Sequence, residues 1–248
     1  MTANPSPKTL QDNLRALRLP YMLEHAVKAA EEAARTRTGH LRFLEELIEG
    51  EAAMRHDRAV NRRIAAARFP VIKSMAAWDW NWPKKINRMQ IEHLLRLDFL
   101  DAHENVILAG PTGVGKTHLS IAIGHAACLR GKSVLFASAI DVVNRLSAAE
   151  STRQLHREMK RYLAPALLAI DELGYLPLDK RGAELLFQVI SKRYEAGSIL
   201  ITTNIAFKDW PQIFAGDATM TSALLDRLLH HAHPILIEGD SYRSAKRK

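Results

Sequence analysis

The sequence of 248 residues contains a single cysteine and lacks any long apolar segment. Cys128 has no second cysteine with which to form an internal disulfide, and it falls in a segment that we expect to be a buried helix, so its thiol is predicted to be packed and inert. No apolar run approaches the roughly 20 residues that a membrane-spanning helix needs, and residues 1–10 contain no apolar signal core. These absences argue against a disulfide scaffold and a helical membrane protein, and they predict a soluble, cytoplasmic protein with no membrane partner.

Acidic residues are fewer than basic ones, and the excess of basic residues lies toward the two ends of the chain. The formal net charge is +8: residues 1–100 carry 17 basic and 12 acidic residues, residues 243–248 carry 4 basic ones, and residues 101–242 are nearly neutral with 14 and 15. Basic flanks around a neutral centre favour a polyanionic partner, and DNA or RNA more than a membrane. A basic surface that serves only solubility would give the same charge. The apolar share of 47% fits one large domain, or one domain with a small appendage.

The first quarter of the chain is helical in pattern. Residues 8–68 show helical periodicity, and Pro20 and Gly39 divide them into about three helices, so we predict an all-helical N-terminal domain of residues 1–68. Residues 69–104 are predicted to be a linker and a lead-in to the next domain. Three tryptophans alternate along this linker, and packing against a core is favoured over stacking on bases: Trp78, Trp80 and Trp82.

From residue 105 onward, strand-like runs alternate with helical patterns. This alternation predicts an α/β domain of residues 105–248 in which helices cover both faces of a five-stranded parallel sheet. The predicted strands are 105–109, 133–137, 166–170, 198–203 and 234–238.

A glycine-rich octet follows the first predicted strand. Residues 110–117 fit the phosphate-loop pattern G-x-x-x-x-G-K-[ST] without a mismatch, and a helical segment comes next. Lys116 is predicted to reach the β- and γ-phosphates of ATP, and Thr117 to ligate Mg²⁺. Backbone N–H groups and the helix N-terminus would hold the phosphates. The residues predicted to surround the nucleotide are Gly110, Pro111, Thr112, Gly113, Val114, Gly115, Lys116, Thr117 and His118.

Polar residues follow two later strands, as a nucleotide hydrolase requires. Asp171 and Glu172 come directly after the third strand, so Asp171 is predicted to hold Mg²⁺ and Glu172 to activate the attacking water. Asn204 follows the fourth strand and could contact both that water and the γ-phosphate. The simpler alternatives are an acidic surface turn and a turn-forming asparagine.

Arg227 lies on a predicted amphipathic helix just before the last strand. A lone arginine there is usually a surface residue, and the alternative is an arginine finger offered to the nucleotide of a neighbouring subunit. Three nearby histidines are interpreted as structural or surface residues, because a metal site would need a wider, convergent set of ligands: His230, His231 and His233.

Basic residues group in three regions that are candidates for contacts with DNA phosphates. A solvated helix face is the alternative for the first region, and the second region could instead line a subunit contact. The candidates are Arg55, Arg58, Arg62 and Arg63, then Arg153, Arg157, Lys160 and Arg161, and finally Arg243, Lys246, Arg247 and Lys248.

These motifs occur in the order found in a known superfamily. The phosphate loop, Ile170-Asp171-Glu172, Thr202-Thr203-Asn204 and Leu225-Asp226-Arg227-Leu228 together resemble an AAA+ ATPase of the initiator and helicase-loader branch. Flanking motifs, among them Gly239-Asp240-Ser241-Tyr242-Arg243, make the chain closer still to the IstB-like ATP-binding helpers of insertion-sequence transposases. The resemblance covers nearly the whole chain.

The resemblance implies a phosphate-loop AAA+ core that lacks the usual C-terminal helical lid, since only about ten residues follow the last predicted strand. Arg243 is then the candidate for the missing sensor 2 arginine. The implied activity is Mg²⁺-dependent ATP hydrolysis by a homo-oligomer that assembles on duplex DNA with little sequence preference. It also implies delivery of target DNA to a partner transposase, and stimulation of that transposase, in DNA transposition and recombination.

Three other functions remain open from the residues alone. The first is a replicative helicase loader resembling DnaC, which would act on single-stranded DNA. The second is a small-molecule phosphotransferase, against which the activating Glu172 and the Arg227 candidate both argue. The third is a nucleotide-gated binding module with little turnover, which Glu172 opposes more weakly.

Overall fold

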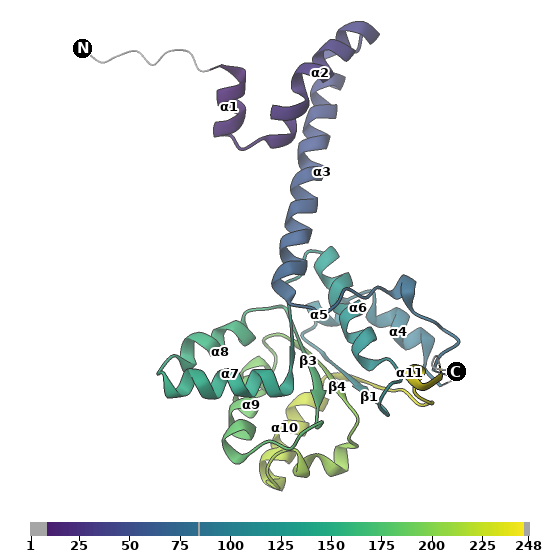
Figure 1. The fold of residues 1–248 in the computed structure, drawn as a ribbon, viewed down its shortest axis with the longest axis vertical. Coiled ribbons are helices and arrows are strands. Elements are labelled where there is room, and N and C mark those ends of the chain that lie inside the picture. The colour runs from purple at the N-terminus through teal and green to yellow at the C-terminus, as the bar shows by residue number, and fades with distance from the viewer. Residues whose placement is uncertain (1–8, 84, 246–248) are drawn as a thin grey trace, which may run out of the picture. The chain divides into compact units, whose positions relative to one another are not determined.

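The protein was analysed as a computed structural model that describes residues 9–83 and 85–245, apart from the side chains of Arg243 and Ala245. The proposed contacts of Arg243, Lys246, Arg247 and Lys248 therefore lie outside the described residues. The chain divides into two compact units, residues 1–62 and residues 63–248. Figure 1 shows the three helices of the first part and the α/β arrangement of the second.

The described residues of the N-terminal unit form three helices, as the periodicity predicts. They are α1 (Leu10–Ala16), α2 (Pro20–Thr36) and α3 (His40–Ala67), and α3 runs past the end of the unit. The buried carboxylate of Glu51 accepts hydrogen bonds from the backbone N–H groups of Tyr21 (2.9 Å) and Met22 (3.2 Å). A carboxylate on these first-turn amides satisfies donors that have no partner within α2 and lies favourably at the positive end of the helix dipole.

The second unit contains the five-stranded parallel sheet that the sequence predicts. Its spatial order is β2-β3-β4-β1-β5. The strands are β1 (Asn105–Ala109), β2 (Val134–Ser138), β3 (Leu167–Leu173), β4 (Ser198–Thr203) and β5 (Ala232–Leu236). The predicted start of β5 at Pro234 is wrong by two residues. Proline is tolerated inside a strand at the edge of a sheet, where its missing N–H leaves no ladder bond unmade, and β5 is an edge strand.

Helices cover both faces of the sheet, and alternate strand residues separate the two cores. On β3, Leu168 and Ile170 belong to the core under α7, α8, α9, α10 and η2, whereas Leu167 and Ala169 belong to the core under α4, α5 and α6. These helices are α4 (Arg88–Leu94), α5 (Asp98–Asp101), α6 (Lys116–Leu129), α7 (Ala139–Ser151), α8 (Leu155–Leu163), α9 (Lys180–Arg193), η2 (Phe207–Gln212) and α10 (Ala218–His230). Within the described residues, no helix is both long and apolar enough to cross a membrane.

The segment expected to be a linker and lead-in, residues 69–104, packs with the sheet. It contains the short helix η1 (Met75–Ala77) as well as α4 and α5, and it buries Trp78, Ile91 and Phe99 in the same core as α6. The favoured interpretation of Trp78 as a packing residue is confirmed. Cys128 is also fully buried, which confirms that it is a packing residue, and this burial raises the pKa of its thiol to about 11.

One buried arginine holds the amino-terminal end of the sheet together. The guanidinium of Arg193 donates to five backbone carbonyls and is only 1% exposed. Burial lowers its pKa to about 10. The acceptors belong to Tyr162, Leu163, Pro165, Ala166 and Ser198, so this side chain joins the end of α8 and the start of β3 to the start of β4.

Candidate functional site

The phosphate loop connects β1 to α6 at the carboxyl edge of the sheet. Gly113 (φ 87°) and Gly115 (φ 99°) adopt backbone conformations that side chains disfavour, which explains glycine at both positions. Among the described residues, no side chain caps the N-terminus of α6, where Gly115 is the capping position. The first N–H groups of α6 are therefore available to an anion, and the helix dipole favours negative charge there.

Lys116 folds back over the loop that precedes it. Its ammonium donates to the carbonyl oxygens of Gly110 and Pro111, both at 2.7 Å. The positive charge is thereby held over the loop in which a phosphate group would lie.

Asp171 and Thr117 meet at the base of the loop, as the sequence predicts. The Thr117 hydroxyl lies 3.0 and 3.1 Å from the two carboxylate oxygens of Asp171, which is 6% exposed. Thr202, on the neighbouring strand β4, donates a second hydroxyl to the same carboxylate at 2.5 Å. A hydroxyl and a carboxylate are the hard oxygen ligands that Mg²⁺ prefers.

A bulge in β3 gives Glu172 a different direction from Asp171. Ile170 pairs with Ile201 and Leu173 with Thr203, so two residues of β3 lie opposite the single residue Thr202. Glu172 has φ 60°, and its N–H donates to the Thr202 hydroxyl at 2.9 Å instead of to a backbone carbonyl. The bulge leaves the Asp171 carboxylate buried and the Glu172 carboxylate exposed.

Thr202 was not assigned a role from the sequence. Its hydroxyl accepts from the Glu172 N–H and donates to Asp171, so a single side chain fixes both acidic residues. The only signal in the sequence was a hydroxyl residue near the end of a strand, two positions before Asn204. That signal is common in loops and strands and does not reveal the bulge opposite.

Most of the residues predicted to form the nucleotide site line one cavity of about 630 Å³, although Gly110 and Pro111 are not part of its lining. Lys116, Thr117 and His118 lie on its wall, together with Glu172 from β3 and Asn204 from the end of β4. The structure therefore brings the phosphate loop and both strand ends to one place. Asp171 lies directly beneath, in contact with Thr117.

Three aromatic residues to which the sequence assigned no role in this site also line the cavity. Trp78 and Trp82, from the segment before the sheet, and Tyr242, after it, all line the cavity. Trp78 packs edge-on against His118 with ring centroids 5.2 Å apart, and Trp82 packs against Tyr242 at 6.1 Å. The N–H of Tyr242 donates to the Gly113 carbonyl at 3.0 Å, which ties the C-terminal segment to the phosphate loop.

The set of residues fits a nucleoside triphosphate with its metal ion. The uncapped helix end and Lys116 suit the phosphates, Thr117 and Asp171 suit Mg²⁺, and the aromatic side chains in the cavity wall offer ring faces or edges to a base. The cavity also lies within the volume range of ordinary small-molecule sites.

Arg227 does not line this cavity. It lies on α10, half-buried, where its guanidinium is 5.4 Å from the centre of the Phe187 ring and donates to the Ala223 carbonyl at 2.6 Å. Within one chain, the arginine is therefore separate from the phosphate loop.

Two of the basic candidates for DNA contacts form ion pairs within the chain. Arg55 pairs with Glu51 at 3.2 Å and donates to the Arg18 carbonyl at 2.9 Å. Arg161 is half-buried and pairs with Glu158 at 3.1 Å. Arg63 is also half-buried, whereas the remaining candidates with described side chains are exposed: Arg58, Arg62, Arg153, Arg157 and Lys160.

Comparison with known proteins identifies a matching family and relatives that cover most of this chain. The family described as "IstB-like ATP binding protein" matches residues 12–248. The chain is 38% identical over 232 residues to the ATP-binding protein of insertion sequence IS5376 from Geobacillus stearothermophilus, covering 94% of this chain and 92% of that protein. It is 36% identical to the ATP-binding protein of insertion sequence IS21 from Pseudomonas aeruginosa, covering 95% and 88%.

Solved structures share the fold at low sequence identity. The crystal structure of DnaI has a TM-score of 0.56 at 18% identity, covering 71% of this chain and 92% of that one. The DnaC helicase loader has a TM-score of 0.51 at 21% identity, covering 60% and 86%. These likenesses confirm the predicted α/β phosphate-loop fold of the AAA+ type, preceded by a helical region.

Proposed function

The chain belongs to the family of IstB-like ATP-binding proteins, and from this membership we propose that it is an Mg²⁺-dependent ATPase that assembles on duplex DNA and delivers the DNA to a partner transposase. The observation that carries the ATPase part is the single cavity that Lys116, Glu172 and Asn204 line, with Asp171 held beneath it on the Thr117 hydroxyl.

In this proposal each residue at the cavity has a separate role in ATP hydrolysis. Lys116 and the N–H groups at the start of α6 bind the β- and γ-phosphates. Thr117 and Asp171 hold Mg²⁺, which when bound neutralises charge on the phosphate oxygens. Glu172 accepts a proton from the attacking water, and Asn204 orients that water against the γ-phosphate.

The assembly part of the proposal rests on Arg227 and on the basic surface. Since Arg227 lies outside the cavity of its own chain, it is available as an arginine finger for the cavity of a neighbouring copy. The exposed arginines Arg58, Arg62, Arg153 and Arg157 provide phosphate contacts that do not depend on base sequence. The names of the relatives, which are proteins of insertion sequences, favour a transposase as the partner.

Electron microscopy with a non-hydrolysed ATP analogue and duplex DNA tests the proposal. We expect ordered multi-subunit assemblies that need both the analogue and DNA. Lys116→Ala should lose ATP binding and assembly, whereas the control Lys192→Ala, an exposed lysine at the end of α9, should keep both. Monomers under all conditions, or normal ATP affinity in Lys116→Ala, would contradict the proposal.

A replicative helicase loader is the second candidate function, because the fold is shared with the DnaC helicase loader. The type of DNA that stimulates ATP hydrolysis separates the two functions. Stimulation by duplex DNA supports the transposition helper, and stimulation by single-stranded DNA alone supports the loader.

A further inference from the structure

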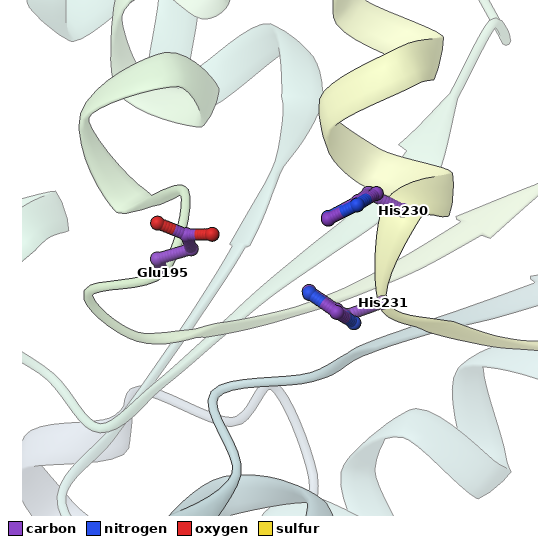
Figure 2. A group of neighbouring side chains, drawn as sticks. All are labelled: Glu195, His230 and His231. Carbon is purple, nitrogen blue, oxygen red and sulfur yellow. The ribbon is translucent and has the colours of Figure 1, made fainter.

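A second group of chemically active side chains lies at the amino-terminal edge of the sheet, at the opposite ends of the strands from the phosphate loop. Glu195 lies in the turn between α9 and β4, His230 is the last residue of α10, and His231 directly precedes β5. Figure 2 shows the three side chains pointing toward one another from these two segments.

The three side chains are close enough to share one ion. Each offers one ligand atom, and the three atoms all lie within 4.8 Å of one another. The rings of His230 and His231 have centroids 4.1 Å apart, and all three residues are exposed. Because the three side chains are exposed, they can rotate to bring their ligand atoms to the about 2.0–2.2 Å from a common centre that zinc requires.

One backbone hydrogen bond and one neighbouring side chain limit how far the two histidines can move. The carbonyl of His231 accepts from the N–H of Asn105 at 2.8 Å, which joins the residue to the start of β1. The Tyr194 hydroxyl lies 3.0 Å from Nδ1 of His230. When Nδ1–H donates to the phenol oxygen, the Nε2 lone pair of His230 is presented to an ion, and a bond donated from the second ring nitrogen orients metal-bound histidine.

We propose that Glu195, His230 and His231 bind a divalent transition-metal ion of the zinc class. Two imidazoles and one carboxylate are a ligand set that zinc uses with water in a fourth, open position. Imidazole nitrogen selects Zn²⁺, Cu²⁺ and Ni²⁺ over Mg²⁺, so this ion is chemically distinct from the Mg²⁺ proposed at Thr117 and Asp171.

The bound ion would join two segments that are about 35 residues apart in the chain. It would fix the turn before β4 to the end of α10, one turn of helix beyond Arg227. Because the unfolded chain does not hold the three ligands together, binding should also raise the temperature of unfolding as the free metal concentration rises.

Calorimetric titration of the full-length, tag-free protein with Zn²⁺ alone tests the site, and the visible absorption of bound Co²⁺ reports the ligand geometry. We expect one Zn²⁺ per chain and a higher unfolding temperature with Zn²⁺. Glu195→Gln should weaken binding at least about tenfold, since even outer-shell changes commonly cost about 10–100-fold in metal affinity. The double variant His230→Ala/His231→Ala should lose both the binding and the Co²⁺ spectrum.

The matched control is His156→Ala, which removes an exposed histidine on α8, away from this group. It should bind Zn²⁺ as the unchanged protein does. Circular dichroism and unfolding in a chelator show whether each variant is folded, which is expected because the substituted residues are exposed. Zn²⁺ affinity that is unchanged in the double variant, or that is absent from the unchanged protein, would overturn the proposal.

Discussion

At the scale of single residues, Thr202 links the two acidic residues of the site. Its hydroxyl donates to the buried carboxylate of Asp171 and accepts from the backbone N–H of Glu172, which has a positive φ. A positive φ costs free energy in a residue other than glycine and persists only where the surroundings hold it. The bulge therefore gives two adjacent carboxylates different exposures, and with them the different roles proposed above.

The side-chain amide of Glu172→Gln keeps the size of the carboxylate but cannot accept a proton. We expect ATP to bind with nearly unchanged affinity and hydrolysis to slow by about 10²–10⁴-fold, because a positioned general base typically contributes that much. Single-turnover hydrolysis and a fluorescent ATP analogue measure the two quantities. The matched control is Glu184→Gln, on α9, which should hydrolyse normally. Unchanged turnover in Glu172→Gln would remove this residue from catalysis.

Thr202→Val removes the hydroxyl and keeps the shape of the side chain. Asp171 then loses a donor and the Glu172 N–H loses its acceptor, so we expect kcat to fall by about 10–100-fold, which corresponds to the about 1–3 kcal/mol of an unsatisfied buried group. Thr202→Ser restores the hydroxyl and should recover most of the rate. If the valine variant is as active as the unchanged protein, Thr202 does not position the acidic residues.

At the scale of elements, loops are held to strands by specific polar side chains as well as by the apolar cores. Arg193 on α9 bonds to carbonyls at the end of α8, at the start of β3 and at the start of β4. No carboxylate is among these acceptors, so the guanidinium is held by backbone dipoles. The arrangement fixes the amino-terminal edge of β3 and β4 and so supports the strands whose other ends carry Asp171 and Asn204.

Arg193→Met fills similar space but leaves buried carbonyls without donors. We expect a loss of at least about 3 kcal/mol in the free energy of unfolding, since hydrogen bonds to charged groups contribute about 1.5–3 kcal/mol each. Denaturant titration followed by circular dichroism measures this loss. Lys192→Met, at the neighbouring exposed position, should change stability by less than about 0.5 kcal/mol. Equal stabilities of the two variants would show that the Arg193 bonds contribute little.

At the scale of the whole molecule, the proposed function needs several copies of the chain and a DNA partner. The cavity of one chain is lined by the phosphate loop, Glu172 and Asn204, with Asp171 beneath it on the Thr117 hydroxyl, but Arg227 is not among its lining residues. If ATP joins two copies through Arg227, the nucleotide state controls assembly, and the basic flanks determine how strongly the assembly holds DNA.

Mixing two inactive variants tests whether Arg227 acts on a neighbouring copy. Arg227→Ala should bind ATP and hydrolyse it about 10³–10⁵-fold more slowly, the range measured for arginine fingers in other nucleotide hydrolases. Lys116→Ala should be inactive because it binds ATP poorly. A mixture of the two contains interfaces with an intact phosphate loop and an intact arginine, so part of the DNA-stimulated ATPase activity should return. Normal hydrolysis by Arg227→Ala alone would assign the arginine to packing against Phe187.

The salt dependence of DNA binding tests the basic surface. Arg58→Gln/Arg62→Gln should lower the slope of log affinity against log salt by about two, since each lost phosphate contact lowers it by about one, and preference among DNA sequences should change little. The control is Arg35→Gln/Arg42→Gln, whose guanidiniums pair with nearby glutamates. Charge reversal in all three basic regions without any change in affinity or slope would refute the prediction.

The sequence by itself determined the parts of this protein that depend on local pattern. Apolar runs and helical periodicity predicted the three leading helices and the five strands, because burial on both sheet faces demands such runs. The octet at 110–117 needs its glycines for backbone conformations that few other residues adopt, so it could be recognised without a structure. Asp171 was predictable because polar residues at the ends of parallel strands meet at one edge.

Only the tertiary structure decided which distant residues meet. The cavity combines Trp78 and Trp82 with Tyr242, and Glu195 lies beside His230 and His231, although nothing in the spacing along the chain relates these residues. The bulge at Glu172 depends on the pairing of β3 with β4, and the hydrogen bond from Arg55 to the Arg18 carbonyl depends on how the segment before α2 lies against α3. Each of these is a contact between segments, and side-chain contacts between segments depend on packing and register, which a local pattern does not encode.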